Sequence, residues 1–275
     1  MATVDWTSES TYDYGMAQQN PVTVAGIYRY PVKGLTPEPL DSVPLRAGQT
    51  LPADRRYAIE NGPIGFDPAD PKYFPKIRFL MLMRNERLAG LRTRYHDDSH
   101  VLTIEYNGGE TVRGDLETPD GRAAIETFFA VNFSPELKGP PKILAAPGHS
   151  FSDVASKVVS IINLASVAAI ETIVGQAVHP LRFRGNLYVS GWPAWHEFDL
   201  LGKEITIGHV RLKVVKRIVR CAAVNVDPVT AERDMNIPHA LMQMFDHADC
   251  GVYAEVITGG AIAAGDPITD VSSTA

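Results

Sequence analysis

A concentration of basic residues precedes one of the two cysteines in this sequence. Five of the eleven residues from Arg211 to Cys221 are Lys or Arg, although the protein has a net charge of −6. The adjacent Arg220 favours the thiolate form of Cys221, and the thiolate is both the nucleophile and the metal ligand in cysteine chemistry. The same cations suit a phosphate-bearing ligand. A structural interpretation stays open: an edge strand protected by charge, with Cys221 as a small core residue.

Two further stretches carry groups that bind anions. In Arg182-Phe-Arg184-Gly-Asn186, two guanidinium groups flank an aromatic ring and an amide follows. Guanidinium groups bind phosphate or carboxylate through paired hydrogen bonds, and an amide both donates and accepts. The stretch Tyr30-Pro-Val-Lys33 and the later Arg55 would add two more cations. Taken alone, the first set is also typical of an ion-paired loop, and Lys33 and Arg55 are typical of surface charges.

Other cysteine chemistries have weaker support. Cys221, His239, His247 and Cys250 have the residue types of a zinc site, but no two cysteines lie two to four residues apart. A cysteine–histidine hydrolase is open on residue types alone, since the chain has eight histidines. The sequence contains no Gly-x-Ser-x-Gly, Gly-x-Gly-x-x-Gly or phosphate-loop motif. It therefore gives no support to a serine hydrolase or a nucleotide-binding fold.

The composition is typical of a soluble globular protein. The 275 residues are 45% hydrophobic and 21% charged, which suffices for a sizeable core in one or two domains. The mild acidity argues against binding to nucleic acid or to an anionic membrane. Neither a secretory signal nor an apolar stretch of membrane-spanning length is visible, so we expect a cytoplasmic protein. Two cysteines are too few for a disulfide framework.

Short strands must position most of these side chains. β-Branched and aromatic residues predict strands over 22–30, 101–106, 110–113, 186–190 and 204–215, the last broken by a turn at 208–209. Strands at 252–257 and 261–268, around two glycines, predict a closing hairpin. This pattern favours barrels or folded-over sheets over a doubly wound sheet.

Helices are expected to be few. The patterns predict them at 123–129 with a cap near Asp120, at 166–174 with Ser166 as N-cap and Gly175 just past the end, and at 238–245. A Gly- and Pro-rich stretch over 139–148 has the composition of a linker.

Together these motifs resemble those of the MOSC family, the domain named after the C-terminal part of molybdenum cofactor sulfurase. Two-domain members of the family include the mitochondrial amidoxime-reducing component and its bacterial relatives. The similarity runs from about Val22 to Ile268. It rests on five motifs in the family's order: Tyr30–Lys33, Gly48–Arg55, Arg182–Asn186, Arg220-Cys221 with Val226–Thr230, and Cys250–Tyr253 before Gly265-Asp266.

The resemblance implies a fold and a domain division. We expect a mainly β (α+β) chain, with an N-terminal β-barrel domain over 22–115 and a barrel-like MOSC domain with a few helices over 116–269. Tails are expected at 1–21 and 270–275.

The resemblance also implies a role for each matched residue. Cys221 would be the thiolate bound to molybdenum, which also takes two sulfurs from the pterin dithiolene. The pterin and its phosphate would be held by the other matched residues, Lys33, Arg55, Ser166, Arg184, Asn186, Arg220 and Tyr253. Ser166 has separate support, because a helix N-terminus binds anions.

Three positions depart from the family pattern. Gly34 stands where the family has serine, so one hydroxyl contact to the cofactor is missing, and Gly185 stands where proline is common. Cys250 replaces an aromatic or aliphatic residue, and we expect it to be a buried spectator.

The implied activity is the reduction of N-hydroxylated or N-oxide-type small molecules, by oxygen-atom transfer at the molybdenum of a bound molybdenum cofactor. Neither a ferredoxin-type cysteine set nor a desulfurase module is visible in the sequence. We therefore expect a separate electron-transfer protein of ferredoxin, flavoprotein or cytochrome type, and no pyridoxal phosphate on this chain. A non-catalytic carrier of the cofactor, or of sulfur on Cys221, would use the same residues and stays open.

Overall fold

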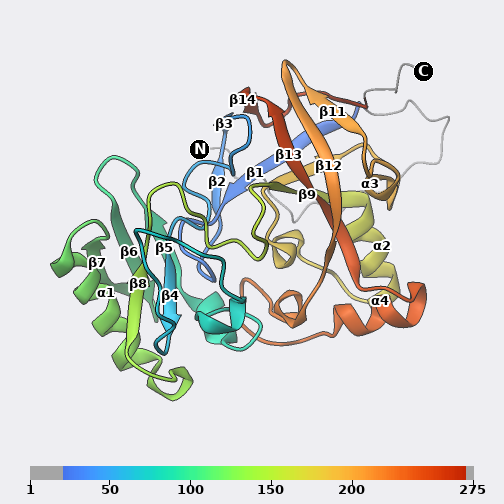
Figure 1. Ribbon diagram of the computed structural model, residues 1–275. Helices are drawn as coiled ribbons and strands as arrows, with labels where there is room; N and C mark the ends of the chain where they lie inside the picture. The colour runs from blue at the N-terminus through green and yellow to red at the C-terminus, as the bar shows by residue number, and fades with distance from the viewer. Residues whose placement is uncertain (1–20, 271–275) are drawn as a thin grey trace.

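The largest sheet takes strands from both ends of the chain. The computed structural model describes residues 21–270, and eight strands follow the order β15-β11-β12-β13-β9-β10-β1-β2 (Figure 1). Their bounds are β1 Thr23–Arg29, β2 Glu38–Leu40, β9 Val159–Asn163, β10 Leu187–Ser190, β11 Glu204–Ile207, β12 Val210–Val219, β13 Asp249–Thr258 and β15 Ile268–Asp270. β1 pairs antiparallel with β10, and β10 pairs parallel with β9. N-terminal strands thus complete a sheet built mostly from the second half of the sequence.

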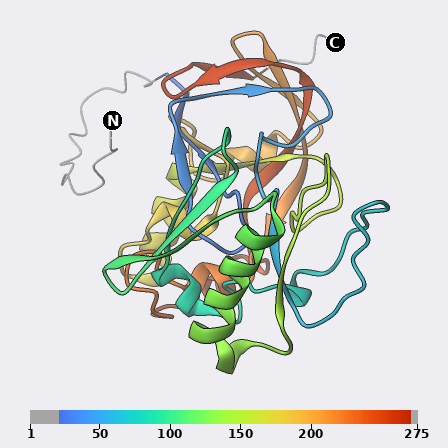
Figure 2. The ribbon, with the colours of Figure 1, turned by 90° about the vertical axis from the view of Figure 1, so that its left-hand side faces the viewer.

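A second unit contains two smaller sheets and helix α1 (Pro119–Asn132). β4 (Ala58–Asn61) pairs with β8 (Pro141–Leu144), while β5 (Arg92–Tyr95), β6 (Val101–Tyr106) and β7 (Gly109–Asp115) form a three-stranded sheet. In Figure 2, α1 lies in front of these strands, and its buried Phe128 and Phe129 share their core. The predicted linker therefore contributes a strand, and α1 packs with the elements before residue 115.

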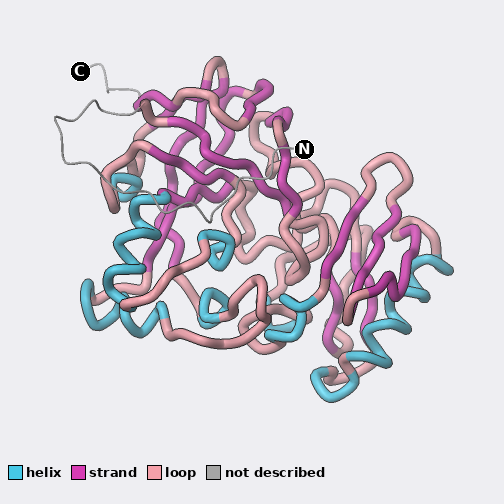
Figure 3. The backbone as a smooth tube through the Cα atoms, turned by 180° about the vertical axis from the view of Figure 1, so that it is seen from behind, coloured by secondary structure: helices cyan, strands magenta, loops and turns pink. Residues whose placement is uncertain are grey.

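Helices cover the large sheet on the face away from its main core. α2 (Leu164–Val174) and α4 (Ile237–Phe245) bury Val167, Ile170 and Leu241 in one cluster with Ile162 of β9. The view from behind in Figure 3 shows these helices on one side and the second unit on the other. The remaining helical turns are α3 (His196–Asp199) and the 3-10 helices η1 Lys76–Arg78, η2 Glu86–Gly90, η3 Ser134–Glu136, η4 Pro180–Phe183 and η5 Ala222–Asn225.

The structure confirms a mainly β chain with a few helices, but two strand interpretations were wrong. β12, which carries the basic run, lies between β11 and β13 and is not an edge strand. The closing hairpin does not form, because β14 (Gly260–Ala263) pairs with β3 (Ser42–Leu45) and not with β13. That pairing buries Ile262 opposite Val43 in the core of the large sheet.

Two predicted helix caps were also wrong. Asn163 caps α2 through its side chain, so Ser166 lies within the first turn of the helix. Thr118 caps α1, and Asp120 follows it inside the helix. The predicted end of α2 is confirmed, since Gly175 ends the helix in the left-handed conformation that glycine tolerates best. Of the predicted tails, residues 1–20 and 271–275 lie outside the described residues. Between residues 21 and 270, every helix is too short or too polar to cross a membrane.

Candidate functional site

One cavity brings together most of the predicted site residues. Its volume is about 230 Å³, and its lining comes from both units and from the segment that joins them. Seven of the eight predicted residues line it: Lys33, Arg55, Arg184, Asn186, Arg220, Cys221 and Tyr253. The eighth, Ser166, does not.

Cys221 reaches the cavity because of irregularities in β12. The first part of the strand alternates buried and exposed side chains, as expected for one face on a core. The pairing with β13 then shifts register between Val214 and Lys216 and again between Arg217 and Val219. Such bulges bend a strand and redirect its side chains. The end of the basic run therefore lines the cavity, and the free, half-buried Cys221 begins the turn η5.

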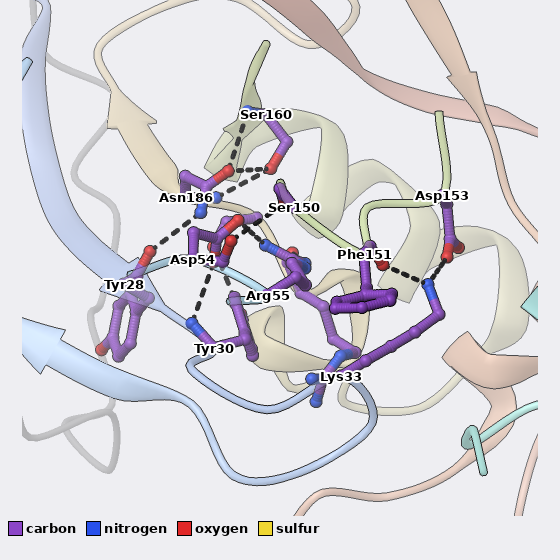
Figure 4. A network of polar contacts seen from close by, with 12 residues as sticks. Tyr28, Tyr30, Lys33, Asp54, Arg55, Ser150, Phe151, Asp153, Ser160 and Asn186 are labelled. Carbon is purple, nitrogen blue, oxygen red and sulfur yellow. Dashed lines mark hydrogen bonds and ion pairs between the residues drawn. The ribbon is translucent and has the colours of Figure 1, made fainter. Parts of the chain in front are cut away.

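Lys33 and Asp153 form a charged pair at the cavity wall (Figure 4). The buried Lys33 ammonium also donates to the backbone oxygen of Phe151 at 2.8 Å. Burial alone would raise the pKa of Asp153, but Lys33 and then Lys76 lower it well below the ordinary range of a carboxyl. Asp153 is therefore ionised, and it holds lysines from two different segments of the chain.

Sequence reasoning missed Lys76. It lies in η1, at the end of a stretch that carries no periodicity and matches no motif, and its ammonium lies 3.4 Å from the carboxylate of Asp153. Burial lowers the pKa of Lys76, but Asp153 and the thiol of Cys221 together raise it above its usual value. This lysine thus lies beside the predicted metal ligand.

Two arginines of the same cavity lining stack on one tyrosine. The guanidinium groups of Arg55 and Arg184 lie 4.3 Å and 4.2 Å from the ring centroid of Tyr30, within the range of cation–π contacts. Arg55 also pairs with Asp54 and donates to the backbone oxygen of Arg184 at 3.0 Å. Burial lowers the pKa of Arg184 to about 10.

Both arginines also have an unusual backbone. Arg55 and Arg184 each have φ of 50°, in the left-handed region that non-glycine residues rarely adopt. Such backbone strain is concentrated at functional sites, where the surrounding structure must hold it.

Asn186 and Arg220 line the cavity, but their side chains are hydrogen-bonded to other groups of the protein. The amide oxygen of Asn186 accepts from the backbone N–H and the hydroxyl of Ser160, and its nitrogen donates to the backbone of Tyr28 at 3.1 Å. Arg220 donates through Nε to the backbone oxygen of Cys250 at 2.7 Å, and through Nη1 to that of Phe183 at 2.9 Å. Both side chains fix the cavity wall, a role that sequence motifs do not reveal.

Ser166 is fully buried away from the cavity. Its hydroxyl donates to Glu197 at 2.9 Å and accepts from the backbone N–H of Trp195 at 2.8 Å. Because the helix begins earlier than the sequence suggests, Ser166 belongs to the packing between α2 and α3. The structure therefore does not bring it to the other predicted residues.

The departures from the family pattern have structural explanations. Gly34 lines the cavity with φ of +84°, a conformation in which a serine would be strained. A Cβ at Gly185 would lie 2.3 Å from Cγ1 of Ile162, so no larger residue fits without movement. Cys250 is fully buried as expected, and burial raises the pKa of its thiol to about 12.

The donor set suits a metal group that brings its own ligands. Within residues 21–270, no three His, Cys, Asp or Glu side chains are grouped so that they could hold a metal ion. This counts against the zinc alternative with Cys221, His239, His247 and Cys250. A single free thiol among cations, in contrast, fits an anionic metal cofactor whose remaining donors are external to the protein.

Three known proteins are similar to this chain. Molybdenum cofactor sulfurase of Caenorhabditis elegans is 34% identical over 83 residues, which are 30% of this chain and only 11% of that protein. The solved structure of YiiM from Geobacillus stearothermophilus is 20% identical and has a TM-score of 0.34, covering 42% of this chain and 54% of its own. The YUAD protein from Bacillus subtilis is 12% identical with a TM-score of 0.39, covering 90% and 94%.

Two family models account for nearly the whole described chain. The model of the MOSC N-terminal beta barrel domain matches residues 21–138, and that of the MOSC domain matches residues 144–269. Both contribute residues to the cavity, from Lys33 in the first to Tyr253 in the second. The chain therefore belongs to the MOSC family, in its two-domain form.

Proposed function

We propose that this protein binds molybdenum cofactor through Cys221 and reduces N-hydroxylated or N-oxide-type small molecules. One observation carries the proposal: a free, half-buried thiol lines a cavity with eight Lys and Arg side chains and only two Asp side chains. This arrangement, in a chain of the MOSC family, suits an anionic cofactor whose metal accepts a soft ligand.

The chain's own residues divide the work of binding. Cys221 would ligate the metal, and Lys33, Arg55 and Arg184 would hold the pterin and its phosphate. Asn186 and Arg220 keep the wall in place through their backbone contacts. When bound, the cofactor supplies the two-electron redox chemistry. Its charge is offset by preorganised cations, which need no reorganisation during the reaction.

The reaction requires a source of electrons outside the site. Conversion of an N–OH group to N–H consumes two electrons and two protons and releases water. A separate electron-transfer protein would provide the electrons. Pyridoxal phosphate has no place in this proposal, and a small organic molecule is the substrate.

Replacement of the thiol tests the proposal directly. Wild type and Cys221→Ala are purified from a host that makes the cofactor, and molybdenum content, pterin fluorescence and benzamidoxime reduction are measured with a supplied electron-transfer chain. We expect molybdenum and turnover in the wild type, and loss of turnover in Cys221→Ala with an unchanged circular dichroism spectrum. Cys250→Ala is the matched control and should retain the metal.

The outcomes separate the candidate functions. Full activity of Cys221→Ala, or zinc in place of molybdenum in the wild type, would overturn the assignment. Stoichiometric transfer of the cofactor to another enzyme without turnover would favour the carrier, which uses the same residues.

A further inference from the structure

Two lysines of the cavity lining are left without a role in holding the cofactor. Lys76 comes from η1 in the second unit, and Lys216 comes from β12 in the large sheet. Neither belongs to the motifs that carry the family resemblance. Their two segments approach the cavity from different parts of the molecule.

Lys216 lies on the cavity side of its strand. It pairs in register with Tyr253, and paired residues of neighbouring strands share a face of the sheet. Other basic residues of β12 have acidic neighbours, since Arg211 pairs with Glu204 and Arg217 lies 4.0 Å from Asp249.

The charge of Lys216 is available to a ligand. Its side chain is exposed, and within the described part of the chain its ammonium has neither an ion pair nor a hydrogen bond. An exposed cation at a cavity mouth can therefore meet an incoming anion without first breaking a contact.

Lys76 is only partly neutralised. Its contact with Asp153 is 3.4 Å long, whereas Lys33 makes a shorter contact with the same carboxylate. One carboxylate thus serves two lysines, and the three side chains together carry a net positive charge at the cavity wall. Basic linings focus anions even on a protein whose net charge is negative.

We infer that the substrate carries a negatively charged group, such as a carboxylate, which Lys216 and Lys76 bind while the reducible group lies at Cys221. The inference rests on the proposed function and narrows its substrate class. Lys216 provides the first contact at the mouth, and Lys76 provides charge nearer the thiol.

A matched pair of substrates tests the inference. 4-Carboxybenzamidoxime and 4-carbamoylbenzamidoxime have nearly the same shape and differ in charge. With a small viologen dye as electron donor, we expect kcat/KM to be about three- to tenfold higher for the carboxylate, as one or two partly exposed ion pairs allow. This preference should fall at high salt.

Variants at two lysines of β12 test whether Lys216 causes the preference for the carboxylate. Lys216→Met should lower the preference about two- to fivefold, and Lys216→Arg should retain most of it. Lys213→Met is the matched control, because Lys213 is also an exposed lysine of β12 but does not line the cavity. Its preference should equal that of the wild type.

Failure of the inference is distinguishable from failure of the proposed function. Equal kcat/KM for the two compounds, with both reduced, overturns the anionic substrate and leaves the reductase standing. If neither compound is reduced, the proposed reductase activity is overturned. The anionic-substrate inference is then tested by measuring the binding of both compounds by calorimetry. Tighter binding of the carboxylate that weakens in Lys216→Met supports the inference, and equal binding overturns it.

Discussion

At the scale of single residues, the two cysteines have opposite environments. Cys221 is half-buried at a cation-lined cavity, whereas Cys250 is fully buried among apolar side chains. Arg220 is close to both cysteines. It directly precedes Cys221 in the sequence, and its Nε donates to the backbone oxygen of Cys250. Arg220 thus links the segment that carries Cys221 to the core around Cys250.

This contrast predicts that the two thiols differ in reactivity. In the cofactor-free protein at pH 8, one thiol should react rapidly with Ellman's reagent, and Cys221→Ala should abolish that phase. Cys250 should react at least about a hundredfold more slowly, because its burial raises its pKa to about 12 and excludes the reagent. In 6 M guanidinium both thiols should react. Two rapid phases in the native protein would contradict the assignment.

The sequence predicted which residues line the cavity better than it predicted the contacts that these residues make. Motif residues far apart in sequence, such as Lys33 and Tyr253, do line one cavity. That Arg220 and Asn186 are held by backbone groups depends on tertiary neighbours that no spacing reveals. The sequence does not predict Lys76, because η1 and Cys221 come together only in the folded protein.

At the scale of elements, an arginine clamp holds the segment that follows Cys221. Arg182 in η4 is buried and donates to Asp234 at 2.8 Å and to Asp227 at 2.7 Å. Asp227 also accepts from the backbone N–H groups of Val229 and Thr230, which closes a turn. The clamp therefore fixes the segment that leaves the cavity after the predicted ligand.

Removal of the clamp should destabilise the protein. We expect Arg182→Met to lower the free energy of unfolding by about 2 to 4 kcal/mol, somewhat less than for a fully buried pair because the side chain of Asp234 is 34% exposed. Lys72→Met, which removes an exposed partner of Asp70, is the matched control and should leave the free energy of unfolding unchanged within error. Urea unfolding followed by fluorescence measures both.

The pH dependence of this loss provides a second check. Burial raises the pKa of Asp227, but the N–H groups of Thr230 and Val229, together with Arg182, lower it below its ordinary value. A lowered native pKa stabilises the fold above the unfolded pKa of about 4, and this contribution is lost as the pH falls. The difference between wild type and Arg182→Met should thus be full at pH 7 and shrink below about pH 4. An equal difference at pH 3 and pH 7 would mean that packing, and not charge, is responsible.

Element positions were predicted more reliably than element partners. β-Branched and aromatic residues located β1, β6 and β10, and a proline in the first turn located α4, each to within about two residues. Strand pairing is not local. The glycines at 259–260 suggested a hairpin with the preceding strand, but β14 pairs with β3, which is far away in the sequence. The predicted Ser166 cap was wrong for a different, local reason: Asn163 is an equally good cap and lies about one turn earlier.

At the scale of the whole molecule, the chain leaves the large sheet and returns to it. β1, β2 and β3 belong to the large unit, the second unit follows with β4 to β8, and β9 re-enters the large sheet. Lys33 and Arg55 lie on the outgoing segment, and Asp153 lies on the returning one. The cavity is therefore formed where the chain crosses twice between the two units, which couples the site to the folding of both.

This path predicts that the C-terminal family domain does not fold alone. A fragment of residues 139–275 lacks Val24, Ile27, Val43 and Leu45, each at most 3% exposed in the core of the large sheet. At about 1.5–3 kcal/mol for each buried side chain, their loss removes about 6 to 12 kcal/mol. That is comparable with the whole stability of a typical domain.

We expect the fragment to show no cooperative urea transition, while the full chain unfolds in one. Co-expression of residues 1–138 should restore a soluble complex, because β1 can again pair with β10 and cover its open edge. The matched control is a co-expressed 1–138 segment with Val24→Asp and Ile27→Asp, which should fail to rescue. A cooperative transition in the isolated fragment would show that the large sheet is stable without its N-terminal strands, and the site would then depend on the first segment only for Lys33 and Arg55.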